Sequence, residues 1–383
     1  MDGHGGGACS QVLSARLLEY IAAAILPKTL LEQHLNILNK GSQRMHLLDY
    51  SIPHSGYINK ELEKLHEESY KKYLERLLEK RETESEITMT NALTTAFTEL
   101  DADMGNEAIN NKRVETFNDT LAVALSGAVG IVGHIDGRHL HVANLGDCAA
   151  VIGSISDTGR WIAKKITKDH SCENESETER IQNEHPVKEK TTVIRGDRLL
   201  GMLAPYRAFG DYRFKWKKEL IEKVMVPSCG KTIIPPNYET PPYLSNIPEV
   251  FHYKLLPRDR FMILASDGLW EQLNISQIVR LVGEHLSGKI TLTPLKLPRR
   301  PLKFKQINEM LLQRKEALKS KPVDHNVATR LIRYSLGAYD YGIEHSRLSQ
   351  LLSLPDEIVR QFRDDITIIV VTFDNDYLRH CPD

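Results

Sequence analysis

The stretch Gly130-Ile131-Val132-Gly133-His134-Ile135-Asp136-Gly137, followed closely by His139-Leu140-His141-Val142-Ala143, decides the fold class of this chain. Both apolar runs are short enough to be strands. The Asp-Gly pair between them predicts a tight hairpin, because aspartate and glycine tolerate positive φ. Ala149 to Gly153 and Trp161 to Ala163 continue the series. Consecutive strands of this kind indicate an antiparallel meander rather than βαβ units.

Further elements are predicted outward from this meander. Ala122 to Leu125 reads as a strand that precedes it, and Arg260 to Ala265 and Ile366 to Thr372 read as later strands. Apolar residues recur at three and four positions, the helical period, in the segments that come first. These predicted helices, which would cover a sheet, are Gln11 to Leu26, residues 60–82 and Thr88 to Met104.

Two segments interrupt the pattern. Prolines crowd residues 226–249, and prolines with many Lys and Arg residues occupy 289–321, so both are predicted to be irregular surface insertions. The basic segment could contact a partner, although a solvated loop is the simpler interpretation. The domain prediction is therefore a single domain over residues 1–383 with two insertions.

Bulk composition restricts the class of protein. The 383 residues are 41% hydrophobic and 26% charged, with 50 basic against 51 acidic residues, which is ordinary globular composition without a global signal for nucleic acid. The five cysteines are odd in number and lack paired spacing, which argues against a disulfide framework or a zinc knuckle. The sequence shows no apolar run of the ~18–20 residues that span a bilayer.

Short acidic motifs carry the chemistry. Hard divalent cations prefer carboxylate and carbonyl oxygens, and a carboxylate at the end of a buried strand is well placed to supply one. Taken alone, an Asp-Gly after a strand is more often a plain turn, and an N-terminal glycine run is typical of a flexible tail. The five motifs are Asp2–Gly6, Asn144–Asp147, Arg207–Asp211, Ala265–Gly268 and Arg363–Thr367.

In their order, these motifs resemble those of the metal-dependent protein phosphatase family of the 2C type, the PPM-type Ser/Thr phosphatases. The resemblance runs from residue 2 to about residue 373. It implies an α+β fold, a four-layer αββα sandwich of two antiparallel sheets flanked by helices. The matching segments are Asp2–Gly6, Ser126–Ala128, Asn144–Val151, Asp169-His170, Glu179–Ile181, Tyr206–Asp211, Ala265–Glu271 and Arg363–Thr367.

Within that family the chain is similar to the pyruvate dehydrogenase phosphatases. The segments that carry this likeness are Asp197–Gly201, Phe214–Trp216, Ile234–Tyr238, Thr240–Leu244, Asn326–Arg333 and Leu351–Pro355. The likeness implies a phosphoserine substrate on the E1 component, docking to the lipoyl-bearing core of the complex, and room for a regulatory subunit. It also implies the mitochondrial matrix, no nucleic-acid partner and no membrane span.

The resemblance also assigns roles. Two Mg²⁺ or Mn²⁺ ions activate a bridging water that attacks the phosphorus in line with the leaving oxygen. Asp2 would bridge both ions and the Gly3 carbonyl would bind one, while Asp267 and Asp364 would bind the other. Asp147 would hold a coordinated water or a weaker third ion. His4 would be the general acid that protonates the departing seryl oxygen.

The chain departs from the family pattern in several places. This chain has Val129-Gly130 where the family usually has Thr-Ala, Cys148 where it has Ser, and Asp365 where it has Asn. We expect these differences to adjust the properties of the site without abolishing it. The family also has two or more strands before its first motif, with an Arg that clamps the phosphate and a Glu that completes a metal shell. This chain begins at Met1, so the expected fold lacks those N-terminal strands.

Two functional readings follow from that start. The first is a metal-dependent phosphatase seen as an incomplete product, and the second is a truncated, inactive pseudophosphatase that acts only as a binding protein. Because a bidentate guanidinium is hard to replace, we expect little or no Mn²⁺-dependent hydrolysis from these 383 residues.

Overall fold

The computed structural model describes residues 1–40, 47–50, 60–83, 87–111, 114–288, 303–319, 324–339 and 342–381. These residues divide into two compact units, which we treat separately. The first unit comprises Met1–His134, His141–Cys148 and Lys168–His252. The second comprises Ile135–Leu140, Ala149–Thr167 and Tyr253–Asp383.

The first unit is built on a five-stranded sheet. Strands follow the order β1-β2-β3-β9, and β8 also pairs with β2. The two pairings of β2 with β1 and β8 are antiparallel. The bounds are β1 Asp2–His4, β2 Gly127–Asp136, β3 His139–Leu145, β8 Phe209–Gly210 and β9 Glu249–Lys254.

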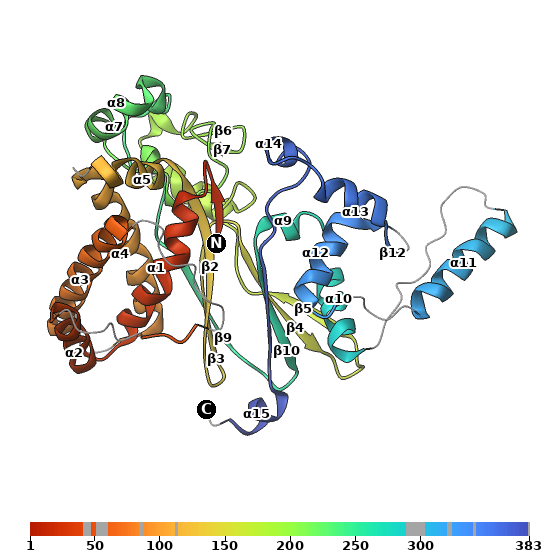
Figure 1. Cartoon of the computed structure of the whole chain (residues 1–383). Helices are drawn as coiled ribbons and strands as arrows, with labels where there is room; N and C mark the ends of the chain where they lie inside the picture. Colours follow the sequence, from red (N-terminus) through yellow and green to blue (C-terminus); the bar gives the residue numbers. More distant parts are fainter. Residues whose placement is uncertain are drawn as a thin grey trace. The chain divides into compact units, whose positions relative to one another are not determined.

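Helices pack beside this sheet. In Figure 1, α1 and α4 lie next to one another against the sheet, and α2 lies along α3. The apolar stripes that the period predicts are buried in one core with Leu13, Leu17, Leu93 and Phe97 fully enclosed. The bounds are α1 Ala8–Ile25, α2 Lys28–Asn39, α3 Lys60–Thr83, α4 Met89–Asn110 and α5 Val114–Leu125, followed by α6 Glu175–Glu184 and α7 Lys218–Val224.

Helix α1 has the length and hydropathy of a membrane-crossing segment, and it is the one such helix among the described residues. Slightly more than half of it, 56%, is buried inside the unit. Its Arg16 is also buried, in a bidentate pair with Glu107 on α4 at 2.8 and 2.9 Å. A helix that packs an ion pair into a protein core in this way behaves as a core helix.

The second unit is built on a four-stranded antiparallel sheet in the order β13-β10-β4-β5. Figure 1 shows α10 and α12 beside one another at this sheet. Trp161 of β5 lies directly under Gly283 of α10, where an added Cβ would come within 2.0 Å of the indole. The bounds are β4 Ala149–Ile155, β5 Trp161–Lys165, β10 Asp259–Ala265, β13 Ile368–Thr372, α9 Asp267–Trp270, α10 Ile275–Ser287 and α12 Val327–Gly337.

The structure confirms the hairpin of the opening stretch and corrects its extension. Gly137 has φ +54° in the turn between β2 and β3. The series is not one meander, however, because β3 and β4 belong to different sheets. The chain leaves the first sheet at Gly146-Asp147-Cys148, where the small bend replaces the hairpin that a meander would need.

Three further predictions were wrong in part. Ala122–Leu125 is not a strand but the last turn of α5, where alanine and leucine are strong helix formers. Residues 289–321 are not wholly irregular, since Phe304–Lys319 forms α11, while 289–302 lie outside the described residues. The proline-rich segment is not confined to the surface, because Tyr243 and Leu244 are buried at 1% and 2% exposure.

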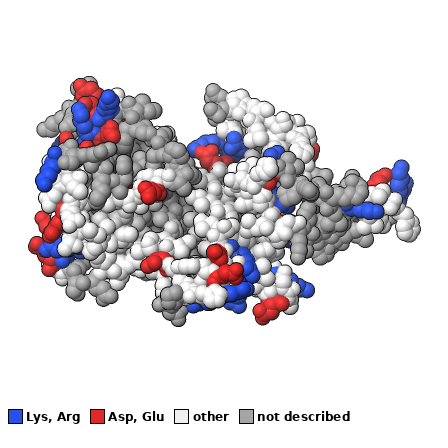
Figure 2. All heavy atoms as spheres, turned by 60° about the horizontal axis from the view of Figure 1, so that its bottom comes forward, with Lys and Arg blue, Asp and Glu red and all other residues white. Residues whose placement is uncertain are grey.

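Charged side chains of both signs are interspersed over the face drawn in Figure 2, among the described residues. This distribution agrees with the nearly balanced totals of 50 basic and 51 acidic residues.

Candidate metal centre and active site

The first motif forms an edge strand of the first unit. Asp2 faces Val129 and His4 faces Gly127 across the antiparallel β1–β2 ladder. Glycine at position 127 leaves room for the pair of side chains above it, because a Cβ there would lie 2.2 Å from Asp211 Oδ2 and 2.3 Å from His4 Nε2. The Asp-Gly-His motif is therefore an ordered strand whose side chains have fixed neighbours, and not a flexible tail.

His4 has a specific partner, Asp211. Its Nε2 donates to Asp211 Oδ2 at 2.5 Å, and the side chains are 28% and 3% exposed. Asp211 is in the left-handed conformation, and its N–H donates to the Ser126 carbonyl at 2.9 Å. A carboxylate on one imidazole nitrogen fixes the tautomer and the ring orientation, so the outer nitrogen of His4 has a defined direction.

Asp211 is the functional residue that sequence reasoning missed. The Arg207–Asp211 motif was recognised, but no role was assigned to its aspartate. The sequence feature that could have identified Asp211 is the Gly-Asp pair that ends a short apolar run, because it places a carboxylate directly after a strand. The partner of that carboxylate lies 207 residues away in the sequence, so the pairing had no local signature.

The Asn144–Asp147 motif is held by His170. The Gly146 N–H donates to His170 Nδ1 at 3.0 Å, and the Gly146 carbonyl accepts from the His170 N–H, also at 3.0 Å. Asn144 Nδ2 donates to the same carbonyl at 3.1 Å. Three bonds on one glycine fix the bend from which Asp147 projects, half-buried, after β3.

Burial sets the protonation of His170. It is fully buried, and burial, then the positive charge of Arg207, lowers its pKa from 6.5 to about 4. Since Nδ1 accepts from Gly146, the neutral ring carries its proton on Nε2, 3.4 Å from Glu249 Oε2. The ring is thus neutral in the fold and charged in the unfolded chain at mildly acidic pH.

This difference predicts a pH dependence of stability. The unfolded chain binds the extra proton as pH falls from 6.5 towards 4, so the contribution of His170 to the free energy of unfolding is fully present above pH 6.5 and decreases through that window. We expect His170→Asn, which keeps an acceptor for the Gly146 N–H, to reduce the loss of unfolding free energy between pH 7 and 4.5 by about 2–3 kcal/mol. Urea unfolding at both pH values measures it. The same pH dependence in variant and parent would contradict the assignment, and His380→Asn on the exposed α15 (Asn375–His380) is the control.

Arg207, the first residue of the third motif, forms an ion pair with Glu177. Its Nε donates to Glu177 Oε2 at 2.9 Å, a second nitrogen binds Oε1, and Nη1 donates to the Ile247 carbonyl at 2.9 Å. Burial opposes ionisation of Glu177, but the hydrogen bonds of Arg207 and Arg180 outweigh it and lower its pKa to about 2. The pair ties the motif to α6 and leaves Arg207 with a structural role.

The second unit brings its two candidate ligands to one end of a strand pair. Antiparallel β10 and β13 pair Ala265 with Ile368. Asp267 comes just after β10 and Asp364 just before β13. The turns are joined through Ser266, whose Oγ donates to the Asp365 carbonyl and accepts from the Thr367 N–H, both at 3.1 Å. Both aspartates thus lie near the ends of paired strands, although β13 begins only at Ile368 and Asp364 is exposed, and their binding of a metal stays a prediction.

The residues present fit hard divalent cations. The donors are carboxylates and one backbone carbonyl, the ligands that Mg²⁺ and Mn²⁺ prefer. The Asp267 turn is closely packed, since a Cβ on Gly268 would lie 2.5 Å from the Asp365 carbonyl oxygen. Within the described ranges, no group of three or more His, Cys, Asp or Glu side chains is gathered for a metal. The expected ligands are divided, with Asp2, Gly3 and Asp147 in the first unit and Asp267 and Asp364 in the second.

Comparison with known proteins identifies the family. The sequence pattern of the Protein phosphatase 2C family matches residues 34–300. The mitochondrial pyruvate dehydrogenase (acetyl-transferring) phosphatase 1 of Homo sapiens is 41% identical over 98% of this chain and 72% of its own length. The human phosphatase 2 of that name is 39% identical over the same shares. A Saccharomyces cerevisiae phosphatase 1 is 32% identical over 74% of this chain and 53% of its own length.

The chain therefore belongs to the protein phosphatase 2C family. It is a metal-dependent protein-serine/threonine phosphatase with strong similarity to the pyruvate dehydrogenase phosphatases. The comparisons do not favour the alternative of an inactive binding protein.

Proposed function

We propose that this chain hydrolyses phosphoserine on the E1 component of pyruvate dehydrogenase, with Asp2, Gly3, Asp267 and Asp364 holding two Mg²⁺ or Mn²⁺ ions and Asp147 holding a coordinated water or a weaker third ion. The observation that carries the proposal is the His4–Asp211 pair, whose histidine lies on the same short strand as Asp2. An acid that is held by a buried carboxylate, on the same strand as a proposed metal-binding carboxylate and separated from it by one residue, suits removal of a phosphoryl group from an alcohol.

Each residue has one task in this mechanism. Asp211 Oδ2 accepts a hydrogen bond from His4 Nε2–H, so the acid is the doubly protonated ring, which gives its Nδ1 proton to the departing seryl oxygen and keeps the proton on Nε2. The β1–β2 ladder keeps Asp2 and His4 in a fixed relation. Asp267 and Asp364 contribute the carboxylates of the second unit. The metal ions, when bound, would lower the pKa of a water molecule and offset phosphate charge.

The substrate class rests on the relatives. Their names specify pyruvate dehydrogenase as the target and the mitochondrion as the location. We therefore assign this chain to the mitochondrial matrix, with docking to the lipoyl-bearing core of the complex and a regulatory subunit as further partners. We also propose one phosphatase domain over residues 1–383. In support, β2, β3 and β9 each contribute residues to both compact units.

A single-turnover assay tests the proposal, because enzyme in excess over substrate reveals slow as well as fast hydrolysis. We expect phosphate release from a phosphoserine peptide of E1 in Mn²⁺ and its loss in EDTA. Phosphate release that continues unchanged in EDTA would contradict metal dependence. Absence of release while Mn²⁺ binds, as measured by electron paramagnetic resonance, would support the pseudophosphatase.

A further inference from the structure

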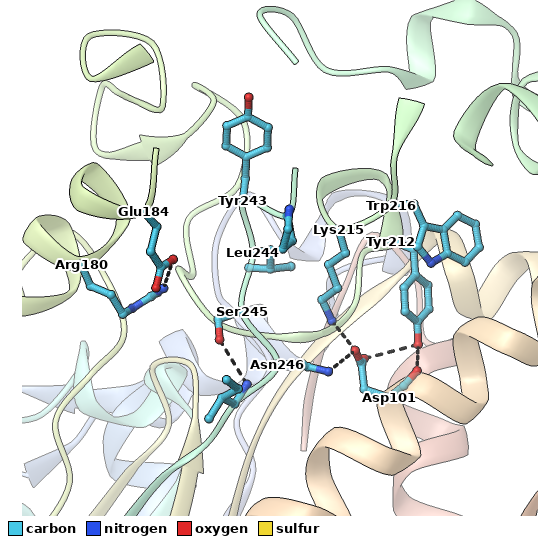
Figure 3. A pocket seen from close by; sticks show the side chains of 12 residues that line it. Asp101, Arg180, Glu184, Tyr212, Lys215, Trp216, Tyr243, Leu244, Ser245 and Asn246 are labelled. Atoms are coloured by element: carbon cyan, nitrogen blue, oxygen red, sulfur yellow. Dashed lines mark hydrogen bonds and ion pairs between the residues drawn. The ribbon is translucent and has the colours of Figure 1, made fainter. Parts of the chain in front are cut away.

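Asp101 lies at the centre of a buried polar network that the proposed chemistry does not use. It is on α4, is 2% exposed, and borders a pocket of about 450 Å³ together with Trp216 and Leu244. Figure 3 shows Lys215 and Asn246 pointing at its carboxylate. Lys215 Nζ and Asn246 Nδ2 both donate to Asp101 Oδ2, at 2.8 and 2.9 Å. A carboxylate with two donors on one oxygen is held firmly in place.

The other oxygen of Asp101 holds the turn that carries Asp211. Its Oδ1 accepts the Gly210 N–H at 2.8 Å. Gly210 has a φ of +67°, which glycine adopts readily, and Asp211 has a φ of +50°, which is uncommon for a residue with a side chain. No side chain fits at position 210, since a Cβ would lie 2.3 Å from the Ser126 carbonyl oxygen.

We propose that Asp101 is a positioning residue for proton transfer by His4. Its carboxylate fixes the Gly210 N–H, and so fixes the left-handed turn and the Asp211 oxygen that accepts from His4. Lys215 and Asn246 act one step further out, by preventing rotation of the Asp101 carboxylate. This inference rests on the proposed function, because it needs His4 to be the acid.

The network requires a carboxylate and not an amide. Asp101 accepts from Gly210, Lys215 and Asn246, all of which are donors. An asparagine has almost the same shape, but its NH₂ group would face at least one of these donors. The ammonium of Lys215, 9% exposed, would also lose its charge partner. Asp101→Asn therefore disturbs the turn without creating a cavity.

The test compares two leaving groups. A departing seryl oxygen needs a proton, whereas p-nitrophenolate leaves as a stable anion without one. We expect Asp101→Asn to lower kcat on a phosphoserine peptide about 10-fold and to leave kcat on p-nitrophenyl phosphate within about 2-fold. A merely structural defect would lower both rates alike. Glu184→Gln is the matched control, an acid-to-amide change at the same pocket on a side chain that pairs with Arg180, and should leave both rates unchanged.

The outcomes separate this inference from the proposed function. If His4→Gln lowers kcat equally on the phosphoserine peptide and on p-nitrophenyl phosphate, the assignment of proton transfer to His4 is wrong. If His4→Gln shows the leaving-group dependence and Asp101→Asn does not, Asp101 has no positioning role. Should Asp101→Asn fail to fold, Asn246→Ala loosens the same carboxylate and should show a smaller loss with the same dependence, and an unchanged ratio of rates would overturn the inference.

A second measurement does not need turnover. Histidine-selective ¹⁵N spectra of the neutral His4 ring, recorded in Mg²⁺, should show a single tautomer in the parent chain, with the proton on Nε2. We expect Asp101→Asn to shift the His4 signals towards a mixture of tautomers, and Glu184→Gln to leave them in place. Identical His4 signals in Asp101→Asn and the parent would overturn the proposal.

Discussion

Replacing His4 with glutamine is expected to lower kcat on a phosphoserine peptide about 10²–10⁴-fold, the usual contribution of a positioned general acid. The side chain lies against Asp211 at 2.5 Å and is 28% exposed, so a proton on its outer nitrogen can reach a substrate. Glutamine keeps a polar end of similar reach but has no proton to transfer. The measurement is single-turnover phosphate release, relative to the parent chain under the same conditions.

The rate on p-nitrophenyl phosphate provides the internal comparison for His4→Gln. It should change far less than the rate on phosphoserine, since that leaving group departs without protonation. Asp211→Asn should give the same pattern with a smaller loss, because the acid remains but its orientation is no longer fixed. His380→Gln is the matched control, since that histidine is exposed and its Nδ1 contacts the Asp376 carbonyl of its own helix. Equal losses on both substrates would mean that His4 is not the acid.

Replacing Asp267 with asparagine is expected to weaken Mn²⁺ binding at least about 10-fold and to slow phosphoserine hydrolysis about 10²–10³-fold. Its carboxylate comes directly after β10, in a turn packed against the Asp364-Asp365 turn. An amide has the same size but lacks the negative charge that a hard cation requires. Mn²⁺ binding, followed by electron paramagnetic resonance, and single-turnover hydrolysis are independent measurements of this loss.

Asp365→Asn is the control for Asp267→Asn. Asp365 is exposed and pairs with the equally exposed Arg360 at 3.1 Å, so its charge is screened by solvent and contributes little. We expect Mn²⁺ affinity and rate within about 3-fold of the parent. If Asp365→Asn is as damaging as Asp267→Asn, the acidic character of the whole turn matters and Asp267 is not a specific ligand. If neither variant affects Mn²⁺ binding, the metal site is elsewhere.

Local sequence was sufficient for the elements with strong, regular patterns. The period of apolar residues predicted α1, α3 and α4 to within a few residues at most ends, because a helix on a core repeats its buried face every three to four positions. The Asp136-Gly137 pair predicted the β2–β3 hairpin for a similar reason, since its turn needs a residue with positive φ. For short apolar runs, local sequence did not decide between helix and strand. Ala122–Leu125 has no period to separate helix from strand, and the tertiary structure makes it helical.

The candidate ligands show the same division. The order of the acidic motifs by itself determined the family and the aspartates to examine, Asp2, Asp147, Asp267 and Asp364. Asp147 and Asp267 follow strands and Asp364 precedes one, and such strand ends are visible in local sequence, whereas Asp2 lies on β1 itself. Only the tertiary structure decided which residues pair by hydrogen bonds: Asp211 with His4, His170 with Gly146, and Asp101 with Gly210. These partners lie 207, 24 and 109 residues apart, and their pairing depends on how strands and helices pack, which no local pattern encodes.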